Sequence, residues 1–440
     1  MSDSAPCRHM MVVGDGLDRV ERARELQAGL RTSTVCRQKS VPRLRAPQLF
    51  DFIVAVPDDA PTSTWLEAAR LVDRLSPVDR VAAFTDKDAG RGAAVAAGLG
   101  LPWHDPVTVE AVSDKAVMRA VLAGSGVDDN TAVVATCPAD VERLAGAVGY
   151  PLICKPARGI RSRGITRIDG PDDIPGALDW GRASVGPLDS KDLIVEKFRC
   201  GTEYSVEAVS EDGEHVVLGL TTTHHLASRA EHYIEIGHVV PAPVDRAEHD
   251  RVAAAVCAAL DALGVRTGVT HTEVIVSADE VHIVETHVRP GGDEIPRLWA
   301  SVTGVDLVDL TVRQSLGLPV LADVRAALAA RSATAELPDY AAIWYACPDG
   351  VGRITGVGGV DAARSLDGVV EVDVVHGEGD LLEPIVNSAH RAAFVCAVGD
   401  SHDEALSRAR AGVGRLSFVV RTRDAGLEQG SGVHGPRIPA

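Results

Sequence analysis

The 440-residue sequence has neither a long hydrophobic run nor an excess of basic residues. No apolar stretch approaches the ~20 residues that a membrane-spanning helix needs, and residues 1–11 lack the charged and apolar segments of a secretory signal. The 62 acidic residues outnumber the 44 basic ones, and the net charge of −18 argues against binding to a nucleic-acid backbone. We therefore expect a cytoplasmic protein without a membrane or nucleic-acid partner, while a small anionic ligand remains compatible with the charge.

Two residue types are sparse in an informative way. The eight cysteines are scattered without the close spacing of zinc or redox motifs, which predicts buried, reduced thiols. Lysine supplies only 6 of the 44 basic residues, at positions 39, 87, 115, 155, 191 and 197. A chain that favours arginine so strongly is expected to keep lysine where a compact positive charge is required.

The first 110 residues alternate between short apolar segments and segments of helical periodicity. The predicted strands are 11–13, 52–56 and 81–84, and the predicted helices are 17–30, 65–75 and 89–100. This order predicts an N-terminal domain, residues 1–112, built on a doubly wound parallel sheet. Gly14-Asp15-Gly16 lacks the third glycine of a dinucleotide-binding fingerprint, so a plain strand-to-helix turn is favoured over the cofactor site of a dehydrogenase.

The remainder of the chain predicts two further domains and a tail. Ser113 and Asp114 are typical caps for a helix over 115–123, and a basic, glycine-bearing loop over 157–164 follows a strand over 150–156. Further strands over 165–168, 193–196 and 204–208 and an amphipathic helix over 245–264 complete the pattern. The predicted domains are 113–325, with a mobile lobe of about 130–197, and a C-terminal α/β domain over 326–423. Residues 424–440 are rich in glycine and predict a flexible tail.

The densest polar pattern lies in a predicted hairpin with a three-residue loop over 278–280. That loop sets a register in which Ser277 faces Val281, Ile275 faces Ile283 and Glu273 faces Glu285. Side chains two apart share a sheet face, so Glu285, His287 and Arg289 should project together beside Glu273. Two carboxylates directly opposite each other repel, and a divalent cation between them would remove that cost.

The alternative for this hairpin is a pair of solvated glutamates on an edge strand. The basic residues on the same face and the following Pro290-Gly291-Gly292-Asp293 segment weigh against it. Gly291 and Gly292 offer backbone N–H groups that no side chain obstructs, which suits the binding of an oxyanion.

Several spaced motifs occur in an order that resembles the ATP-grasp superfamily. They are Asp114-Lys115; Ile153-Cys154-Lys155-Pro156 with Gly159 and Gly164; Val195-Glu196-Lys197-Phe198 with Gly201-Thr202-Glu203-Tyr204; Glu235 with His238; and Glu273 with the segment from Glu285 to Asp293. Within the superfamily the pattern is most similar to the carboxylate–amine ligases, especially the L-amino-acid (dipeptide) ligase branch. The resemblance implies an ATP-grasp fold in which the C-terminal α/β domain closes the structure.

The resemblance also implies a role for each motif. The implied nucleotide-binding residues are Lys115, Lys155, Gly159, Ser162, Gly164, Glu196, Lys197, Phe198 and Glu203. The implied metal ligands are Glu273, Glu285 and His287, the implied catalytic groups are Arg289, Gly291 and Gly292, and the implied substrate-binding residues are Glu235, His238, Arg289 and Asp293. His287 departs from the family, which has asparagine there, and imidazole prefers softer ions than magnesium. The implied cofactors are therefore ATP and two Mg²⁺ ions, with Mn²⁺ as an alternative metal.

The activity implied by the resemblance is that of an ADP-forming ligase. Such an enzyme joins a carboxylate, here an amino acid or a related acid, to an amine through an acyl phosphate. A homodimer and a role in natural-product biosynthesis are expected by analogy. The alternatives are an ATP-grasp carboxylase, a purine-pathway ligase, and an ATP-binding protein that has lost its chemistry. Three of the six lysines, at 115, 155 and 197, stand where the resemblance requires a cation for the nucleotide.

Overall fold

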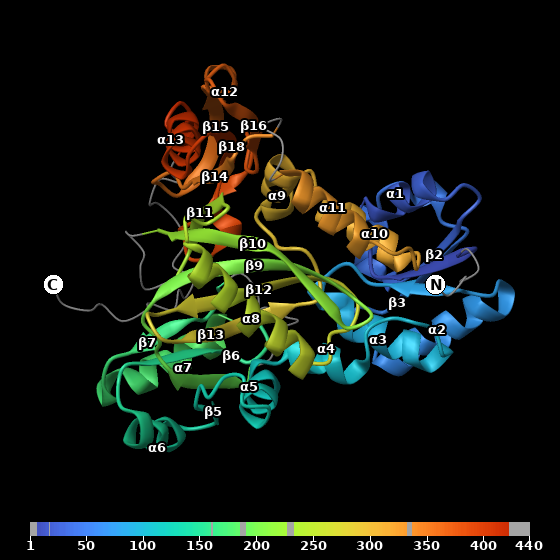
Figure 1. Cartoon of the computed structure of the whole chain (residues 1–440), viewed down its shortest axis with the longest axis horizontal. Coiled ribbons are helices and arrows are strands. Elements are labelled where there is room, and N and C mark those ends of the chain that lie inside the picture. Colours follow the sequence, from blue (N-terminus) through green and yellow to red (C-terminus); the bar gives the residue numbers. More distant parts are fainter. Residues whose placement is uncertain are drawn as a thin grey trace, which may run out of the picture. The chain divides into compact units, whose positions relative to one another are not determined.

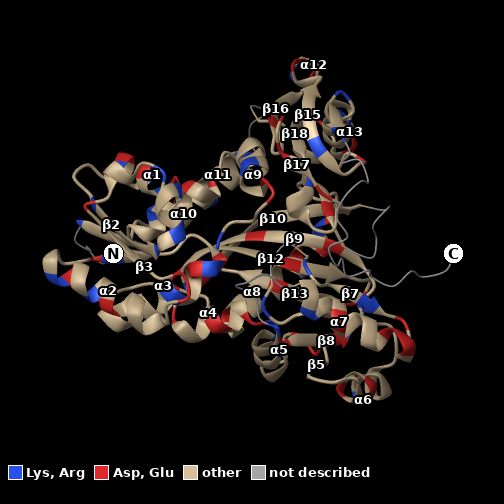
Figure 2. Ribbon diagram, turned by 180° about the vertical axis from the view of Figure 1, so that it is seen from behind, with Lys and Arg blue, Asp and Glu red and all other residues tan. Residues whose placement is uncertain are grey.

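A computed structural model describes residues 7–16, 18–159, 162–184, 191–226, 233–331 and 337–421. The described residues group into two compact units, each assembled from separate stretches of the chain. The first unit comprises residues 1–129, 200–221 and 242–337, and the second comprises 130–199, 222–241 and 338–440. The predicted tail, 424–440, lies outside the described residues. Figure 2 shows acidic positions spread along both units, so the net charge of −18 does not arise from a single acidic segment.

The first unit begins with a four-stranded parallel sheet in the order β3-β2-β1-β4. Its elements are β1 (His9–Val13), α1 (Arg19–Leu26), β2 (Arg31–Arg37), β3 (Phe52–Val56), α2 (Thr62–Leu75), β4 (Arg80–Ala82), α3 (Asp86–Leu99) and α4 (Pro106–Ser113), with short 3-10 turns at Gln38–Arg43 and Pro47–Leu49. Met10 and Val12 of β1 pack on one face of the sheet, whereas Met11 and Val13 pack on the other. Helices cover both faces (Figure 1), which confirms the doubly wound prediction.

Strand β2 is the element of this sheet that the sequence did not reveal. Its residues Thr32, Ser33 and Thr34 are buried although they are polar, so the segment lacks an apolar signal. Each hydroxyl has a partner inside the fold: Thr32 donates to the Leu49 carbonyl at 2.6 Å, Thr34 donates to the Gly14 carbonyl at 2.7 Å, and Ser33 lies 2.6 Å from Nε2 of His9. Because the hydroxyls are satisfied, their burial carries little cost.

The second part of this unit is an antiparallel sheet that packs against α5 (Lys115–Gly124) and α8 (Arg246–Ala262) on one face and contacts α9 (Ile295–Thr303) on the other. Its other elements are β9 (Thr202–Glu211), β12 (Gly268–Val276), β13 (Val281–His287), α10 (Leu307–Ser315) and α11 (Leu321–Arg331). Strand β10 (Glu214–His225) begins in this unit and ends in the other. Val206 and Val274 pack with Met118 and Val256 in one core, so the alternate residues of β9 and β12, among them Glu207 and Glu273, belong to the opposite face.

The hairpin of β12 and β13 confirms the predicted pairing of Glu273 with Glu285 but corrects the rest of the register. The turn spans four residues, closed by Ser277 N–H donating to the Glu280 carbonyl at 2.9 Å. Ile275 therefore faces His282 rather than Ile283. A bulge at Val284 restores the predicted register before the glutamates, because one extra residue in a strand shifts the pairing by one position.

The second unit contains a sheet in the order β5-β8-β6-β7, packed against two helices. Its elements are β5 (Ala132–Ala135), α6 (Pro138–Val148), β6 (Leu152–Pro156), β7 (Thr166–Ile168), a 3-10 turn at Pro171–Asp173, α7 (Ile174–Ser184) and β8 (Leu193–Lys197). Leu152, Cys154, Leu193 and Val195 meet the apolar faces of α6 and α7 in one core. These strands position the predicted lysine, hinge and loop residues.

The remaining elements of this unit are mainly antiparallel strands. They are β11 (Glu235–Val240), β14 (Tyr340–Ala346), β15 (Gly352–Gly358), α12 (Val360–Arg364), β16 (Val369–Val374), β17 (Leu381–Leu382), a 3-10 turn at Ser388–His390, β18 (Ala393–Gly399), α13 (His402–Val413) and β19 (Ser417–Arg421). Strands β11, β14, β18 and β16 are neighbours in that order, and β17-β15-β19 form a small sheet. Helix α13 packs on the larger group through Ala405 and Ala409, so the C-terminal region is α/β as predicted. No helix within the described ranges has the length and apolarity to cross a bilayer.

Candidate active site

The predicted site residues fall in both units, and each set is described within its own unit. The first unit contains Lys115, Glu203, Glu273, Glu285, His287, Arg289, Gly291, Gly292 and Asp293. The second unit contains Lys155, Gly159, Ser162, Gly164, Glu196, Lys197, Phe198, Glu235 and His238.

Glu285 is the centre of the first set. Its Oε2 lies 2.5 Å from Nζ of Lys115 and its Oε1 lies 2.9 Å from Nε2 of His287. Lys115 is placed by Asp114, whose carboxylate accepts hydrogen bonds from two N–H groups in the first turn of α5. Burial alone would raise the pKa of Glu285, but Lys115 and His287 outweigh it and hold that pKa well below its usual range. The sequence therefore predicted correctly that Glu273, Glu285 and His287 share one face of the hairpin.

Asp86 is a member of this cluster that the sequence reasoning missed. Its Oδ2 accepts from Nε of Arg289 at 2.7 Å and lies 2.6 Å from Nη2, and its Oδ1 lies 3.2 Å from Nδ1 of His287. Burial opposes ionisation of Asp86, but the two basic neighbours outweigh it and lower the pKa far below normal. Asp86 lies two residues after the third predicted strand, and the carboxyl end of a parallel strand is where ligand-binding side chains gather. The place of Asp86 after a predicted parallel strand was therefore the sequence signal that could have identified it as a site residue.

Glu207 and His271 form a second, deeper pair beside the carboxylates. Oε1 of Glu207 lies 2.5 Å from Nδ1 of His271, and both side chains are buried. Nε2 of His271 lies 3.6 Å from Oε1 of Glu273. Burial would lower the pKa of His271, but Glu207 and Glu273 reverse that effect and raise it to about 10. The pairing Glu207–His271–His287 across β9, β12 and β13 places these groups in one row.

The glycine segment after β13 is fixed by the same pair. The N–H of Gly291 donates to Oε2 of Glu207 at 3.2 Å. A Cβ at Gly291 would lie 2.8 Å from Nδ1 of His271, whereas a Cβ at Gly292 would meet nothing within 4 Å. Only a residue without a side chain fits at Gly291 in this backbone. The next residue, Asp293, has the left-handed φ of 53°.

In the second unit, Lys155 and Glu196 form a buried ion pair on adjacent strands. Nζ of Lys155 lies 2.5 Å from Oε1 of Glu196. Strand β8 then leads to Lys197, which is exposed, and to Phe198, whose N–H donates to the Pro151 carbonyl at 3.1 Å. The structure thus brings together Lys155, a predicted phosphate-binding residue, and Glu196, a predicted adenine-binding residue.

The predicted phosphate loop is described at Gly159 and from Ser162 onward, while residues 160–161 lie outside the described ranges. Ser162 and Gly164 both adopt positive φ, 55° and 70°. A Cβ at Gly164 would lie 3.1 Å from the Gly181 carbonyl oxygen, so a side chain there would be both strained and crowded.

The predicted substrate residues of this unit lie on β11. His238 is buried, and its Nδ1 lies 3.5 Å from Oγ1 of Thr223 on β10. Glu235 is partly exposed, and its backbone carbonyl accepts from Nη1 of Arg391 at 3.0 Å. In the first unit, Glu203 pairs with Ile275 across β9 and β12.

Comparison with known proteins identifies the fold of this site. Residues 148–296 match the family model of the ATP-grasp domain, and residues 344–421 match that of the L-amino acid ligase C-terminal domain 2. Residues 148–296 therefore carry the signature of an ATP-grasp domain. An L-amino acid ligase from Bacillus licheniformis has the same ATP-grasp fold with a TM-score of 0.79 at 19% identity, covering 95% of this chain and 100% of the other. The predicted resemblance and fold class are confirmed.

Two curated relatives are similar to this chain in sequence. An uncharacterised protein of Sinorhizobium fredii is 27% identical over 311 residues, which is 70% of this chain and 61% of the relative. A D-alanine–D-alanine ligase of Frankia casuarinae is 30% identical over 236 residues, 50% of this chain and 60% of the relative. The chain thus spans about three fifths of the length of each of these relatives.

Proposed function

We propose that this ATP-grasp protein is an ADP-forming ligase that joins the carboxylate of an amino acid or related acid to an amine. The observation that carries the proposal is the cluster around Glu285, in which two facing carboxylates, Lys115, His287 and the Asp86–Arg289 pair converge. Such a cluster can compensate charge on both a metal and a transferring phosphoryl group. The likeness to the L-amino acid ligase structure and to the D-alanine–D-alanine ligase supports this choice of reaction.

The reaction has two steps. A carboxylate oxygen of the first substrate attacks the γ-phosphorus of ATP, the bond to the β-phosphate oxygen breaks, and ADP leaves. The amine nitrogen of the second substrate then attacks the acyl phosphate carbon, inorganic phosphate leaves, and the amine proton is released. The protein supplies position and charge compensation for both steps.

The carboxylates present fit magnesium. Glu273 and Glu285 face each other directly and offer hard oxygen donors of the kind that this ion prefers. They would hold the metal, with His287 as a third ligand whose imidazole prefers softer ions than magnesium; the carboxylates suit manganese as well as magnesium. When bound, the metal neutralises charge on the phosphates. We propose that two magnesium ions bind here.

The chain's own residues have the following proposed roles. Lys115 and Lys155 bind phosphate oxygens, and the segment around Gly159, Ser162 and Gly164 covers them with backbone N–H groups. Glu196, Lys197 and Phe198 bind the adenine, and Glu203 binds the ribose. Arg289, held by Asp86, binds the acyl phosphate together with the N–H of Gly292. The N–H of Gly291 donates to Glu207, so Gly291 supports this group by holding the segment in place. Glu235, His238 and Asp293 bind the amino-acid substrate.

The experiment that tests the function is release of ADP with a panel of amino acids, singly and in pairs, in the presence of magnesium. Amide products from pairs support the ligase. ADP release that depends on bicarbonate would instead indicate a carboxylase, and ATP binding without turnover on the whole panel would indicate a protein that has lost its chemistry.

A lysine substitution makes this experiment specific. Lys155→Met should reduce turnover about a hundredfold or more, as is typical when one charge-stabilising group is removed. The matched control is Lys39→Met, which removes an exposed lysine paired with Asp58 at 3.3 Å. Because Lys155→Met leaves Glu196 buried without its lysine, the double variant Lys155→Met/Glu196→Gln separates loss of nucleotide binding from loss of folding. Normal turnover in the folded double variant would contradict the assignment.

A further inference from the structure

The bulge in β13 decides on which face of the hairpin Glu285 lies. Val274 faces Ile283, and in a regular ladder the next pair would be Glu273 with Val284. Glu285 faces Glu273 instead, because Val284 is the extra residue and pairs with no described residue of β12. Successive side chains of a strand point to opposite faces, so a regular ladder would turn Glu285 toward the apolar face. The bulge therefore aims Glu285 at Glu273.

The extra residue of this bulge is held by a side chain from α5. A bulged residue has no ladder partner, so its backbone groups need other partners where water is excluded. Nη2 of Arg119 donates to the carbonyl of Val284 at 2.9 Å. Arg119 lies in the second turn of α5 and is buried. Its guanidinium thus binds β13 at the residue where the pairing with β12 becomes irregular.

Helix α5 contacts this strand through two basic side chains. Lys115 and Arg119 are four residues apart, so they lie on the same side of the helix. Nζ of Lys115 lies 2.5 Å from Oε2 of Glu285, while Arg119 binds the backbone of the preceding residue. Met118 and Leu122 fix the same helix in the core that the hairpin shares. One helix therefore fixes both the side chain of Glu285 and the backbone that aims it.

The charge of Arg119 by itself would oppose a metal ion between the glutamates. Burial and Arg119 both lower the pKa of Lys115, and the facing carboxylates outweigh them and raise it overall. The charge of Arg119 thus acts on the site as well as its hydrogen bond does. Removing a cation near a metal site would on Coulombic grounds strengthen metal binding. Weaker metal binding after removal of Arg119 would therefore report lost position rather than lost charge.

We propose that Arg119 is a positioning residue, which holds the bulge at Val284 so that Glu285 faces Glu273. The inference rests on the proposed function, because these two glutamates form the proposed metal site. In this role Arg119 contacts neither the metal nor the nucleotide. It acts through the backbone carbonyl that its guanidinium binds.

The test measures Mn²⁺ binding to the full chain in the presence of ADP, with free Mn²⁺ followed by electron paramagnetic resonance. Arg119→Met removes the donor and should weaken Mn²⁺ binding about 10–100-fold, as is typical when a group that orients metal ligands is lost. No Mn²⁺ binding by the unaltered chain would refute the proposed metal site, and the inference with it. Equal affinity of the unaltered chain and folded Arg119→Met would refute the positioning role alone.

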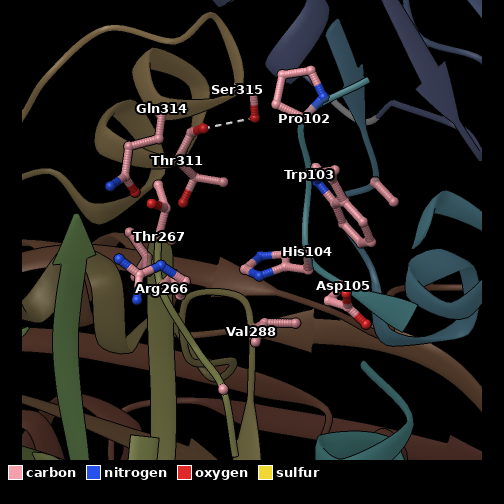
Figure 3. A pocket seen from close by; sticks show the side chains of 14 residues that line it. Pro102, Trp103, His104, Asp105, Arg266, Thr267, Val288, Thr311, Gln314 and Ser315 are labelled. Carbon is pink, nitrogen blue, oxygen red and sulfur yellow. Dashed lines mark hydrogen bonds between the residues drawn. The ribbon is translucent and has the colours of Figure 1, made fainter. Parts of the chain in front are cut away.

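Gln314→Met is the matched control for loss of a hydrogen bond between a helix and a strand. Nε2 of Gln314 on α10 donates to the carbonyl of Ser210 on β9 at 2.7 Å. Gln314 lines a pocket of about 300 Å³ whose described wall includes neither Arg119 nor the two glutamates (Figure 3). This variant should lose thermal stability but bind Mn²⁺ as the unaltered chain does. An equal loss of Mn²⁺ affinity in both variants would indicate a general effect on the fold and would refute the inference.

A deletion separates the bulge from the other contacts of Arg119. Without Val284 the strand has no extra residue, and a regular ladder places Glu285 after Ile283 and opposite Glu273. In that background Arg119→Met should cause no further loss of Mn²⁺ affinity. A loss as large as in the chain that retains Val284 would show that Arg119 acts by another route, and would overturn the proposal. If the deletion variant does not fold, the comparison of Arg119→Met with the glutamine control decides.

Discussion

Replacing Glu207 by glutamine should destabilise the first unit by several kilocalories per mole. The carboxylate is buried, lies 2.5 Å from Nδ1 of His271 and accepts the N–H of Gly291 at 3.2 Å. Removing one member of a buried ion pair costs about 3–5 kcal/mol, because the other charge stays behind without compensation. Glutamine keeps an acceptor for Gly291, so we expect a value near the lower end, about 3 kcal/mol.

The assay is thermal and urea unfolding of Glu207→Gln beside a surface control. A loss of about 3 kcal/mol corresponds to a fall in Tm of about 6–12 °C for a unit of this size. Glu214→Gln is the control because Glu214 pairs with Arg325 at an exposed site, where an ion pair contributes about 1 kcal/mol or less.

The double variant Glu207→Gln/His271→Gln removes both charges and should recover part of the loss. The recovered part measures the coupling of the pair directly. If Glu207→Gln costs no more than Glu214→Gln, or if the double variant is simply additive, the reasoning about the buried pair is refuted.

Two further expectations concern single residues of the first unit. The pKa of His104 in the fold, about 4, lies below the ordinary value of 6.5, so the unfolded chain binds the proton first as the pH falls. The free energy of unfolding should therefore decline from pH 6.5 toward pH 4 by up to about 1.4 kcal/mol per pH unit. In urea titrations, His104→Phe should flatten this decline. If the variant shows the same pH dependence of stability as the unaltered chain, the ring of His104 is not held neutral by the fold. Gly291→Ala should lower stability and, under the proposed function, turnover, because its Cβ would crowd the His271 ring, whereas Gly292→Ala should fold normally. Equal thermal stability of the two variants would contradict the geometry.

The sequence predicted those parts of the structure whose signals are local. Asp114 marked the start of α5 because N-cap chemistry depends on a few neighbouring residues. The facing of Glu273 and Glu285 was also predicted, although the four-residue turn alone would have moved it by one position. The bulge at Val284 compensated for that turn, and no local pattern indicated it.

What the sequence did not reveal depends on contacts between distant segments. Strand β2 is polar, and its burial is explained only by partners such as His9 and Leu49. Asp86 lies about 200 positions before His287 in the chain, so only the fold joins them. In the sequence, Glu207 does not differ from other charged residues of an alternating strand. Its role depends on the pairing of β9 with β12, which places it beside His271.

The ion pairs of Lys115 with Glu285 and of Lys155 with Glu196 have a consequence for the order in which ligands enter. Under the proposed function, ATP does not enter a site of unpaired positive charges. Its phosphates replace the glutamates as the partners of Lys115 and Lys155. A nucleotide that arrived without metal would separate Lys115 from Glu285 and leave the glutamate with His287 but without its lysine partner, and a metal that arrived alone would take the glutamate from the lysine. Magnesium-loaded ATP, as a single ligand, supplies both missing partners at once.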